Sequence, residues 1–192
     1  MLSHYYAKET PWIQTISGIK FHGLNPDPAE ILVSDIIHAL SNLCRYAGHC
    51  KSFYSVAEHS YLMAQYAIKE NYSAEEILWC MLHDVSEIYI QDIPSPFKYQ
   101  FPEYLQAEKS IMEMVAIKFQ LPFPIPKVIE VLDARILLTE RQTLFYNPLE
   151  WGNDIIPLPV DVKCLLPNQI RALYSVLLKQ LLKEHGDFID AD

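Results

Sequence analysis

The pattern of apolar and polar positions predicts a short β-hairpin followed by helices. Between residues 12 and 21 apolar and polar side chains roughly alternate, and Ser17 and Gly18 interrupt the alternation. This pattern is typical of two short strands joined by a turn. Beyond Ser34 the apolar positions recur every three or four residues, which indicates a helix. Ser34 is expected to cap the start of this helix and Gly48 to end it.

Two capping boxes predict the starts of the next two helices. Ser55 and Ser73 are each followed three residues later by a glutamate, Glu58 and Glu76. In such a box the hydroxyl accepts from a free amide of the first turn, and the carboxylate reaches back to the serine amide. We expect the first of these helices to run to about residue 71.

Prolines divide the rest of the chain into helices and rigid connectors. Pro94, Pro96 and Pro102 forbid a continuous helix in that segment and stiffen it. Helical periodicity then predicts three helices, over 103–120, 127–146 and 168–185. The fold class is therefore mainly α, with about six helices and one small N-terminal β-hairpin.

The chain shows no internal repeat, low-complexity tract or linker, so residues 1–192 are expected to form a single domain. Residues 1–30 are interpreted as the hairpin extension of that domain. A formal net charge of −9 argues against nucleic acid as a partner, which requires a basic surface.

Hydrophobicity and cysteine usage indicate a cytoplasmic protein. The sequence contains no uninterrupted apolar run long enough to span a membrane, and its start shows no secretory signal. The four cysteines form no CxxC pair and are interpreted as reduced thiols.

Candidate chemistry centres on His83 and Asp84, which fall in the middle of an apolar segment that is expected to be helical. His59 and Asp133 interrupt the apolar positions of two other predicted helices. Two imidazoles and two carboxylates from three helices suit a divalent cation that keeps open positions for water and substrate. The alternative is a hydrogen-bonded core histidine beside a surface aspartate.

Several motifs in order resemble a known family. The histidine, the His-Asp pair and the later aspartate resemble the signature of HD-domain metal-dependent phosphohydrolases. The stretches Tyr54-Ser-Val-Ala-Glu-His59, Leu82-His-Asp-Val-Ser-Glu87 and Asp92-Ile-Pro-Ser-Pro-Phe-Lys98 are similar to motifs of bacterial 5′-deoxynucleotidases and of phage dATP triphosphohydrolases. The resemblance covers about residues 35–142. It implies an HD-domain helical fold and one divalent metal ion (Co, Mn, Zn, Fe, Ni or Mg).

The resemblance also implies roles for individual residues. The metal ligands would be His59, His83, Asp84 and Asp133. Glu87 follows His83 by four positions, so one helix face is expected to hold both, and its carboxylate would handle the proton of the attacking water. The alternative is that Glu87 only braces an imidazole.

The family pattern makes Asp92 a proton donor to the leaving oxygen or a sugar contact, against the alternative of an ordinary turn aspartate. The predicted substrate-binding residues are Arg45, Tyr46, His49 and Lys98. Arg45 corresponds to a phosphate-binding arginine, and Tyr46 stands where the bacterial enzymes carry tryptophan. Surface roles for His49 and Lys98 stay open, and Glu140 and Arg141 are interpreted as a possible salt-bridged surface patch.

The preferred function is hydrolysis of deoxynucleoside monophosphates by a 5′-deoxynucleotidase. The first alternative is a deoxynucleoside triphosphate triphosphohydrolase of phage-like origin, and the second is a catalytically degenerate nucleotide-binding module. Activity on cyclic dinucleotides or alarmones is less consistent with the sequence, which lacks an extra histidine pair for a second metal. A small-molecule nucleotide is the expected partner. Members of the family that the chain resembles are homo-oligomers, so the resemblance also implies a homo-oligomer.

Overall fold

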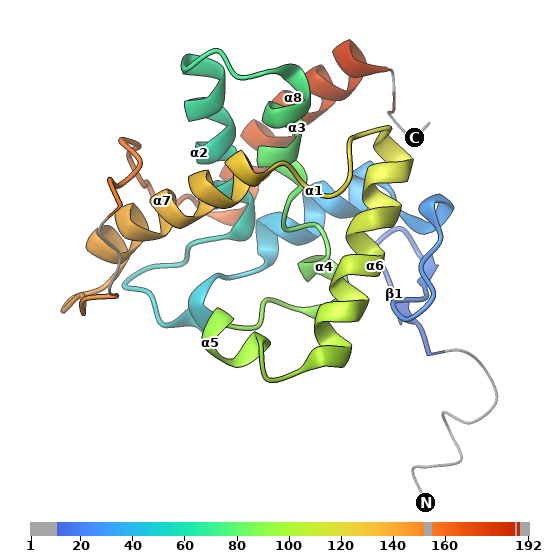
Figure 1. Ribbon diagram of the computed structural model, residues 1–192, viewed down its shortest axis with the longest axis horizontal. Coiled ribbons are helices and arrows are strands. Elements are labelled where there is room, and N and C mark those ends of the chain that lie inside the picture. Colours follow the sequence, from blue (N-terminus) through green and yellow to red (C-terminus); the bar gives the residue numbers. More distant parts are fainter. Residues whose placement is uncertain (1–10, 152–154, 187, 189–192) are drawn as a thin grey trace, which may run out of the picture.

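A computed structural model describes residues 11–151, 155–186 and 188, and within these the protein is mainly helical, as the sequence predicts (Figure 1). The six longer helices are α1 (Val33–Asn42), α2 (Val56–Lys69), α3 (Ala74–Leu82), α6 (Pro102–Phe119), α7 (Lys127–Leu144) and α8 (Pro167–His185). Shorter elements of the described part are the four-residue helices α4 (Glu87–Ile90) and α5 (Ser95–Lys98) and the 3₁₀ turns η1 (Pro28–Glu30) and η2 (Tyr46–Gly48). Among the described helices, none combines the length and the apolar character that crossing a membrane requires.

The N-terminal hairpin is present as predicted and packs on α1. Strands β1 (Ile13–Gln14) and β2 (Lys20–Phe21) pair antiparallel. In the turn between them, the amide and hydroxyl of Ser17 donate to Asp35 Oδ1 on α1, at 3.0 and 2.6 Å. Because Phe21 is fully buried, the second strand also contributes an anchor to the core.

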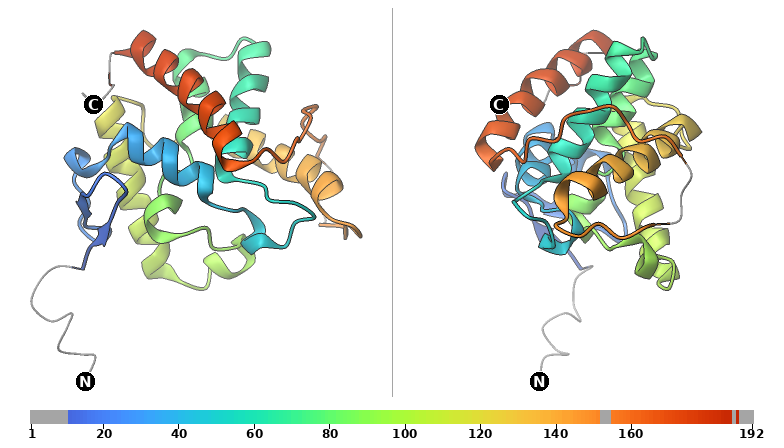
Figure 2. Two further views of the ribbon diagram at one scale, coloured as in Figure 1. Left: turned by 180° about the vertical axis from the view of Figure 1, so that it is seen from behind. Right: turned by 90° about the vertical axis from the view of Figure 1, so that its left-hand side faces the viewer.

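Helices α2 and α3 lie side by side between α7 on one side and α8 on the other (Figures 1 and 2). Their facing surfaces form a contiguous apolar core that includes Trp79 and Cys80, one of four free cysteines. The indole of Trp79 donates to the Pro122 carbonyl at 3.1 Å, and the Tyr174 hydroxyl of α8 donates to the Met81 carbonyl. These bonds connect the last turn of α3 to two other parts of the chain.

The predicted boundaries of α1 were wrong at both ends. The helix begins at Val33 after Leu32, so Ser34 lies inside its first turn rather than at the cap. It ends at Asn42, because the next residue is extended and leads into an isolated bridge between Cys44 and Ser55. Gly48, at φ 81°, closes the separate turn η2 instead.

The capping box at Ser73 is confirmed, whereas the one at Ser55 is only half formed. The Ser55 hydroxyl accepts from the Glu58 amide at 3.1 Å. The Glu58 carboxylate turns away and accepts from three successive amides, those of Lys163, Cys164 and Leu165, at 2.7–2.9 Å. Glu58 therefore anchors the connector before α8 to the start of α2.

The placement of His83 and Asp84 in mid-helix was wrong. Helix α3 ends at Leu82, His83 is its C-terminal cap, and a series of turns leads to α4 at Glu87. His83 and Glu87 consequently do not share one helix face. The segment 92–102, expected to be a loop, contains the single turn α5.

Candidate active site

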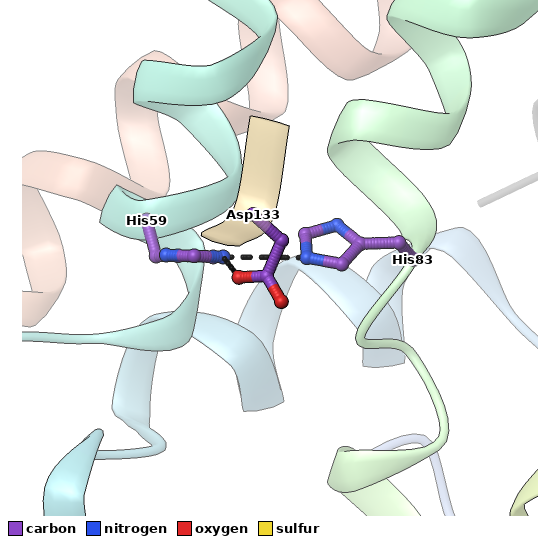
Figure 3. A group of neighbouring side chains, drawn as sticks. All are labelled: His59, His83 and Asp133. Atoms are coloured by element: carbon purple, nitrogen blue, oxygen red, sulfur yellow. Dashed lines mark hydrogen bonds and ion pairs between the residues drawn. The ribbon is translucent and has the colours of Figure 1, made fainter. Parts of the chain in front are cut away.

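Two histidine rings face each other from neighbouring helices. His59 lies in the first turn of α2 and is fully buried, and His83 caps α3. Their Nε2 atoms are 3.3 Å apart, and Asp133 of α7 brings its Oδ1 atom to 3.2 Å from His59 Nε2 (Figure 3). The ligand atoms of these three residues all lie within 4.8 Å of one another.

The other ring nitrogens orient both histidines. His59 Nδ1 is 2.6 Å from Glu140 Oε1, and His83 Nδ1 is 3.0 Å from the Cys80 carbonyl oxygen. Neither acceptor can donate, so each Nδ1 must carry a proton. The neutral imidazoles then point two unprotonated Nε2 atoms at each other beside a carboxylate, an arrangement that requires a cation between them.

Without a metal, that cation is a proton. Burial and Arg45 lower the pKa of His59, but Glu140 and Asp133 raise it more, to about 9. A divalent metal can replace this proton, because ligand atoms about 2.0–2.2 Å from one metal lie roughly 3.0–3.5 Å from each other. The separations of 3.2 and 3.3 Å fall in that interval, so the residues present fit a metal ion.

Asp84 lies at the edge of this cluster. Its Oδ2 atom is 3.3 Å from His83 Nε2 and 3.8 Å from His59 Nε2, and it accepts from Arg45 Nη1 at 3.1 Å. All four predicted ligand residues therefore converge, with Asp84 also engaged by an arginine.

Glu140 is the residue that the sequence interpretation missed. It is fully buried rather than part of a surface patch. Besides the His59 ring, it accepts from the hydroxyls of Tyr46 (2.5 Å) and Tyr54 (2.8 Å), and Arg45 Nε lies 3.5 Å away. Although burial raises the pKa of Glu140, Arg45 and His59 lower it to about 2, so the carboxylate is ionised. The available signal was its position seven residues after Asp133, two turns along the same helix face.

Glu87 begins α4 and is buried, and its Oε2 atom has no hydrogen-bond partner in the described part of the protein. Burial raises the pKa of its carboxyl group, and the nearby charges of Asp84 and Asp92 raise it further, against the opposing effect of Arg45. Glu87 is not one of the three residues whose ligand atoms lie within 4.8 Å of one another, but its carboxyl group interacts electrostatically with Asp84 and Asp92.

A cavity of about 620 Å³ opens next to this cluster. Arg45 and Asp92 are the two residues with ionisable charged side chains among those described in its wall. Burial raises the pKa of Asp92, with Arg45 opposing the shift. The remaining lining consists of Tyr46, Pro94, Ser95, Pro96, Leu137 and Trp151. Its volume lies within the range of small-molecule sites.

The other predicted phosphate contacts, Lys98 and His49, are not among the described residues that line this cavity. Lys98 Nζ is 2.6 Å from Glu108 Oε1, an ion pair that raises the pKa of the lysine although burial lowers it. His49 is exposed after η2 and does not line the cavity. The substrate-binding roles of Lys98 and His49 stay predictions.

A mainly helical fold whose candidate metal ligands come from α2, from α7 and from a His-Asp pair just after α3 is typical of the HD-domain class of proteins. The family model described as YfbR-like 5′-deoxynucleotidase matches residues 33–130, which contain all the predicted site residues except Asp133. The chain belongs to this family, which supports a phosphohydrolase function of the 5′-deoxynucleotidase type.

Two proteins that are similar to this chain in sequence are themselves named as uncharacterized. The uncharacterized protein YfdR of Escherichia coli (strain K12) is 36% identical over 133 residues, covering 69% of this chain and 72% of that protein. An uncharacterized protein of Rhodobacter capsulatus is 31% identical over 124 residues, covering 62% of this chain and 63% of that protein.

Proposed function

We propose that the protein hydrolyses the 5′-phosphate ester of deoxynucleoside monophosphates, with one divalent metal held by His59, His83, Asp133 and Asp84. The observation that carries this proposal is the cluster of cation-requiring ligand atoms next to a cavity with an arginine in its wall. Two imidazoles favour a transition metal over Mg²⁺, which prefers an all-oxygen site. When bound, the metal supplies a Lewis acid for the phosphate and lowers the pKa of water.

The residues around the cavity have complementary tasks in this proposal. Arg45 holds a phosphate oxygen through its guanidinium edge and offsets charge in the transition state. Glu87 accepts the proton of the attacking water, and Asp92, whose pKa is raised by burial, donates a proton to the 5′ oxygen. The P–O5′ bond breaks as the new P–O bond forms, and a deoxynucleoside and inorganic phosphate leave.

The charge of the cavity favours a monophosphate over a triphosphate. Among the described lining residues Arg45 is the one cation, and Lys98 is engaged by Glu108. A triphosphate carries about twice the charge of a monophosphate and calls for additional cations along its length.

A panel of nucleotides tests the proposal with each of Co, Mn, Zn, Fe, Ni and Mg. We expect deoxynucleoside and phosphate from the monophosphates, resolved by chromatography, and loss of both metal and turnover in Asp133→Ala. Release of inorganic triphosphate from deoxynucleoside triphosphates would instead identify the triphosphohydrolase. Metal binding without turnover of any nucleotide would identify the degenerate binding module.

A further inference from the structure

The cavity has two chemically different parts. Arg45 and Asp92 form the part next to the metal cluster, since Arg45 Nη1 also donates to Asp84. Away from these charges the wall is made of proline, leucine and aromatic side chains, with one serine hydroxyl. If the phosphate lies at Arg45, the remainder of the nucleotide must extend along this uncharged part.

Trp151 is the largest residue in the uncharged part of the cavity wall. It reaches the cavity from the connector that follows α7, and the residue is 39% exposed. Its ring centroid lies 6.0 Å from that of Tyr46 and 5.8 Å from that of Phe145, the latter in an edge-on contact at 77°. The Tyr46 hydroxyl donates to Glu140, which fixes the tyrosine ring. The indole of Trp151 is therefore in contact with two rings, those of Tyr46 and Phe145.

The backbone next to Trp151 is anchored to α7. Arg141 Nη1 donates to the Leu149 carbonyl at 3.1 Å and to Glu150 Oε2 at 3.2 Å. Arg141 thus forms a surface ion pair with Glu150 and connects α7 to the backbone just before Trp151.

Pro94 and Pro96 line the same cavity from the segment around α5. Proline rings are rigid and have no amide donor, so they supply flat apolar surface without competing hydrogen bonds. An uncharged wall with an indole and two proline rings suits a planar aromatic heterocycle, because such rings gain from stacking and lose little by leaving water.

We propose that Trp151 stacks on the nucleobase of the substrate and supplies the main contact to it. This inference rests on the proposed function and adds a residue outside the segment 33–130 that matches the family. Stacking of one base contributes about 1–3 kcal/mol, so Trp151→Ala is expected to weaken nucleotide binding roughly 5- to 150-fold. The kcat is expected to change little, because the ring does not touch the reacting phosphate.

Tryptophan fluorescence gives a readout that is independent of turnover. The probe is the phosphonate analogue of deoxyadenosine monophosphate, in which CH₂ replaces the bridging 5′ oxygen and prevents hydrolysis. Trp79 is fully buried in the core and Trp12 lies in the hairpin segment, away from the cavity lining. Binding should therefore quench fluorescence in the wild type and in the control Trp12→Phe, but not in Trp151→Phe.

Calorimetry with two probes separates stacking from general damage to the cavity. Trp151→Ala should weaken binding of the phosphonate but leave binding of 2-deoxyribose 5-phosphate, which has no base, unchanged. Trp151→Phe should restore most of the nucleotide affinity. Equal weakening for both probes, or unchanged nucleotide affinity in Trp151→Ala, would overturn the proposal.

Failure of this inference and failure of the proposed function have different signatures. Hydrolysis of deoxynucleotides with unchanged KM in Trp151→Ala would refute stacking and leave the function standing. Trp151-dependent quenching without any hydrolysis would support stacking and refute the function.

Discussion

Glu140 joins the cluster of His59, His83 and Asp133 to the wall of the cavity through a single buried carboxylate. One oxygen accepts from His59 and Tyr54, and the other from Tyr46, with Arg45 also close to it. The group therefore orients the His59 ring and two residues of the cavity wall, Tyr46 and Arg45, together. A carboxylate that orients a ligating imidazole typically changes metal affinity strongly when it is replaced.

Glu140→Gln is expected to lower metal affinity roughly 10- to 100-fold, because a neutral amide holds the Nδ1 proton of His59 less firmly and makes its Nε2 atom a weaker ligand than a carboxylate does. Competition with a chelator measures this affinity. The matched control is Glu130→Gln, at an exposed position of the same helix. Unchanged affinity in Glu140→Gln would show that the network does not support the metal site.

Glu87→Gln tests the proposed base. The amide keeps the shape but cannot accept a proton, so kcat should fall about 10²- to 10⁴-fold while the metal content stays the same. The measurement is kcat and metal stoichiometry on one preparation, at limiting and at saturating metal.

The alternative for Glu87 makes a different prediction. If Glu87 only braces the metal site, metal affinity should fall instead, and excess metal should restore the rate. Full rescue by metal would refute the role as base.

At the scale of elements, Glu58 connects α2 to the chain that precedes α8. Its buried carboxylate accepts from the amides of residues 163–165, more than a hundred positions away. Since His59 is the next residue, this connection also fixes the turn of α2 that carries the His59 ring.

Glu58→Ala should lower the free energy of unfolding by about 2–4 kcal/mol, because three amides lose a charged acceptor. Glu58→Gln should lose less, since its carbonyl oxygen still accepts. Urea denaturation of the metal-free protein measures both variants. Glu70→Ala, exposed at the end of the same helix, is the control and should stay within about 0.5 kcal/mol of the wild type. If the free energy of unfolding of Glu58→Ala equalled that of the control, Glu58 would not stabilise the connection between α2 and the chain before α8.

At the scale of the whole molecule, the site concentrates negative charge in a protein that is already acidic. The carboxyl groups of Asp84, Asp133 and Glu140 lie 2.6–3.8 Å from ring nitrogens of His59, whereas Arg45 is the one cation among the described residues that line the cavity. The formal net charge of the chain is −9. A phosphate dianion can approach such a site only when further positive charge is present, which a divalent metal provides.

Removal of the metal should therefore lower the Tm, and adding it back should restore it. A metal at 100 times its Kd stabilises the folded state by about 2.7 kcal/mol. Thermal unfolding with and without a chelator measures the effect. Asp133→Ala serves as the control and should show no metal-dependent shift. An equal shift in that variant would place the stabilising metal elsewhere.

Local patterns in the sequence predict much of this structure. The spacing of apolar positions locates the six longer helices to within a few residues at most ends, and alternation locates the hairpin. Residue chemistry and the resemblance of motifs single out His59, His83, Asp84 and Asp133, which the structure brings close together. These signals come from residues a few positions apart, where helical and strand geometry determine which side chains share a face.

The end of α3 shows where local patterns stop being sufficient. The apolar run through His83 and Asp84 looks like a continuous helix, but the chain turns after Leu82. The His83 side chain then bonds a carbonyl that the helix leaves free, and this bond directs its Nε2 atom at His59. The free-energy difference between a helix and a turn in this short segment is small, so contacts with the rest of the protein decide between them.

The tertiary structure alone decided what supports the His59 ring and which residues line the cavity. Glu140 meets His59 across 81 positions and Tyr46 across 94, and Trp151 joins a cavity whose arginine lies in another segment. Neighbouring residues in the sequence do not reveal either position. For Glu140, a buried and a surface glutamate can occupy similar positions in a helical pattern of apolar residues. Burial separates them: without water, a carboxylate must find its donors among distant parts of the chain.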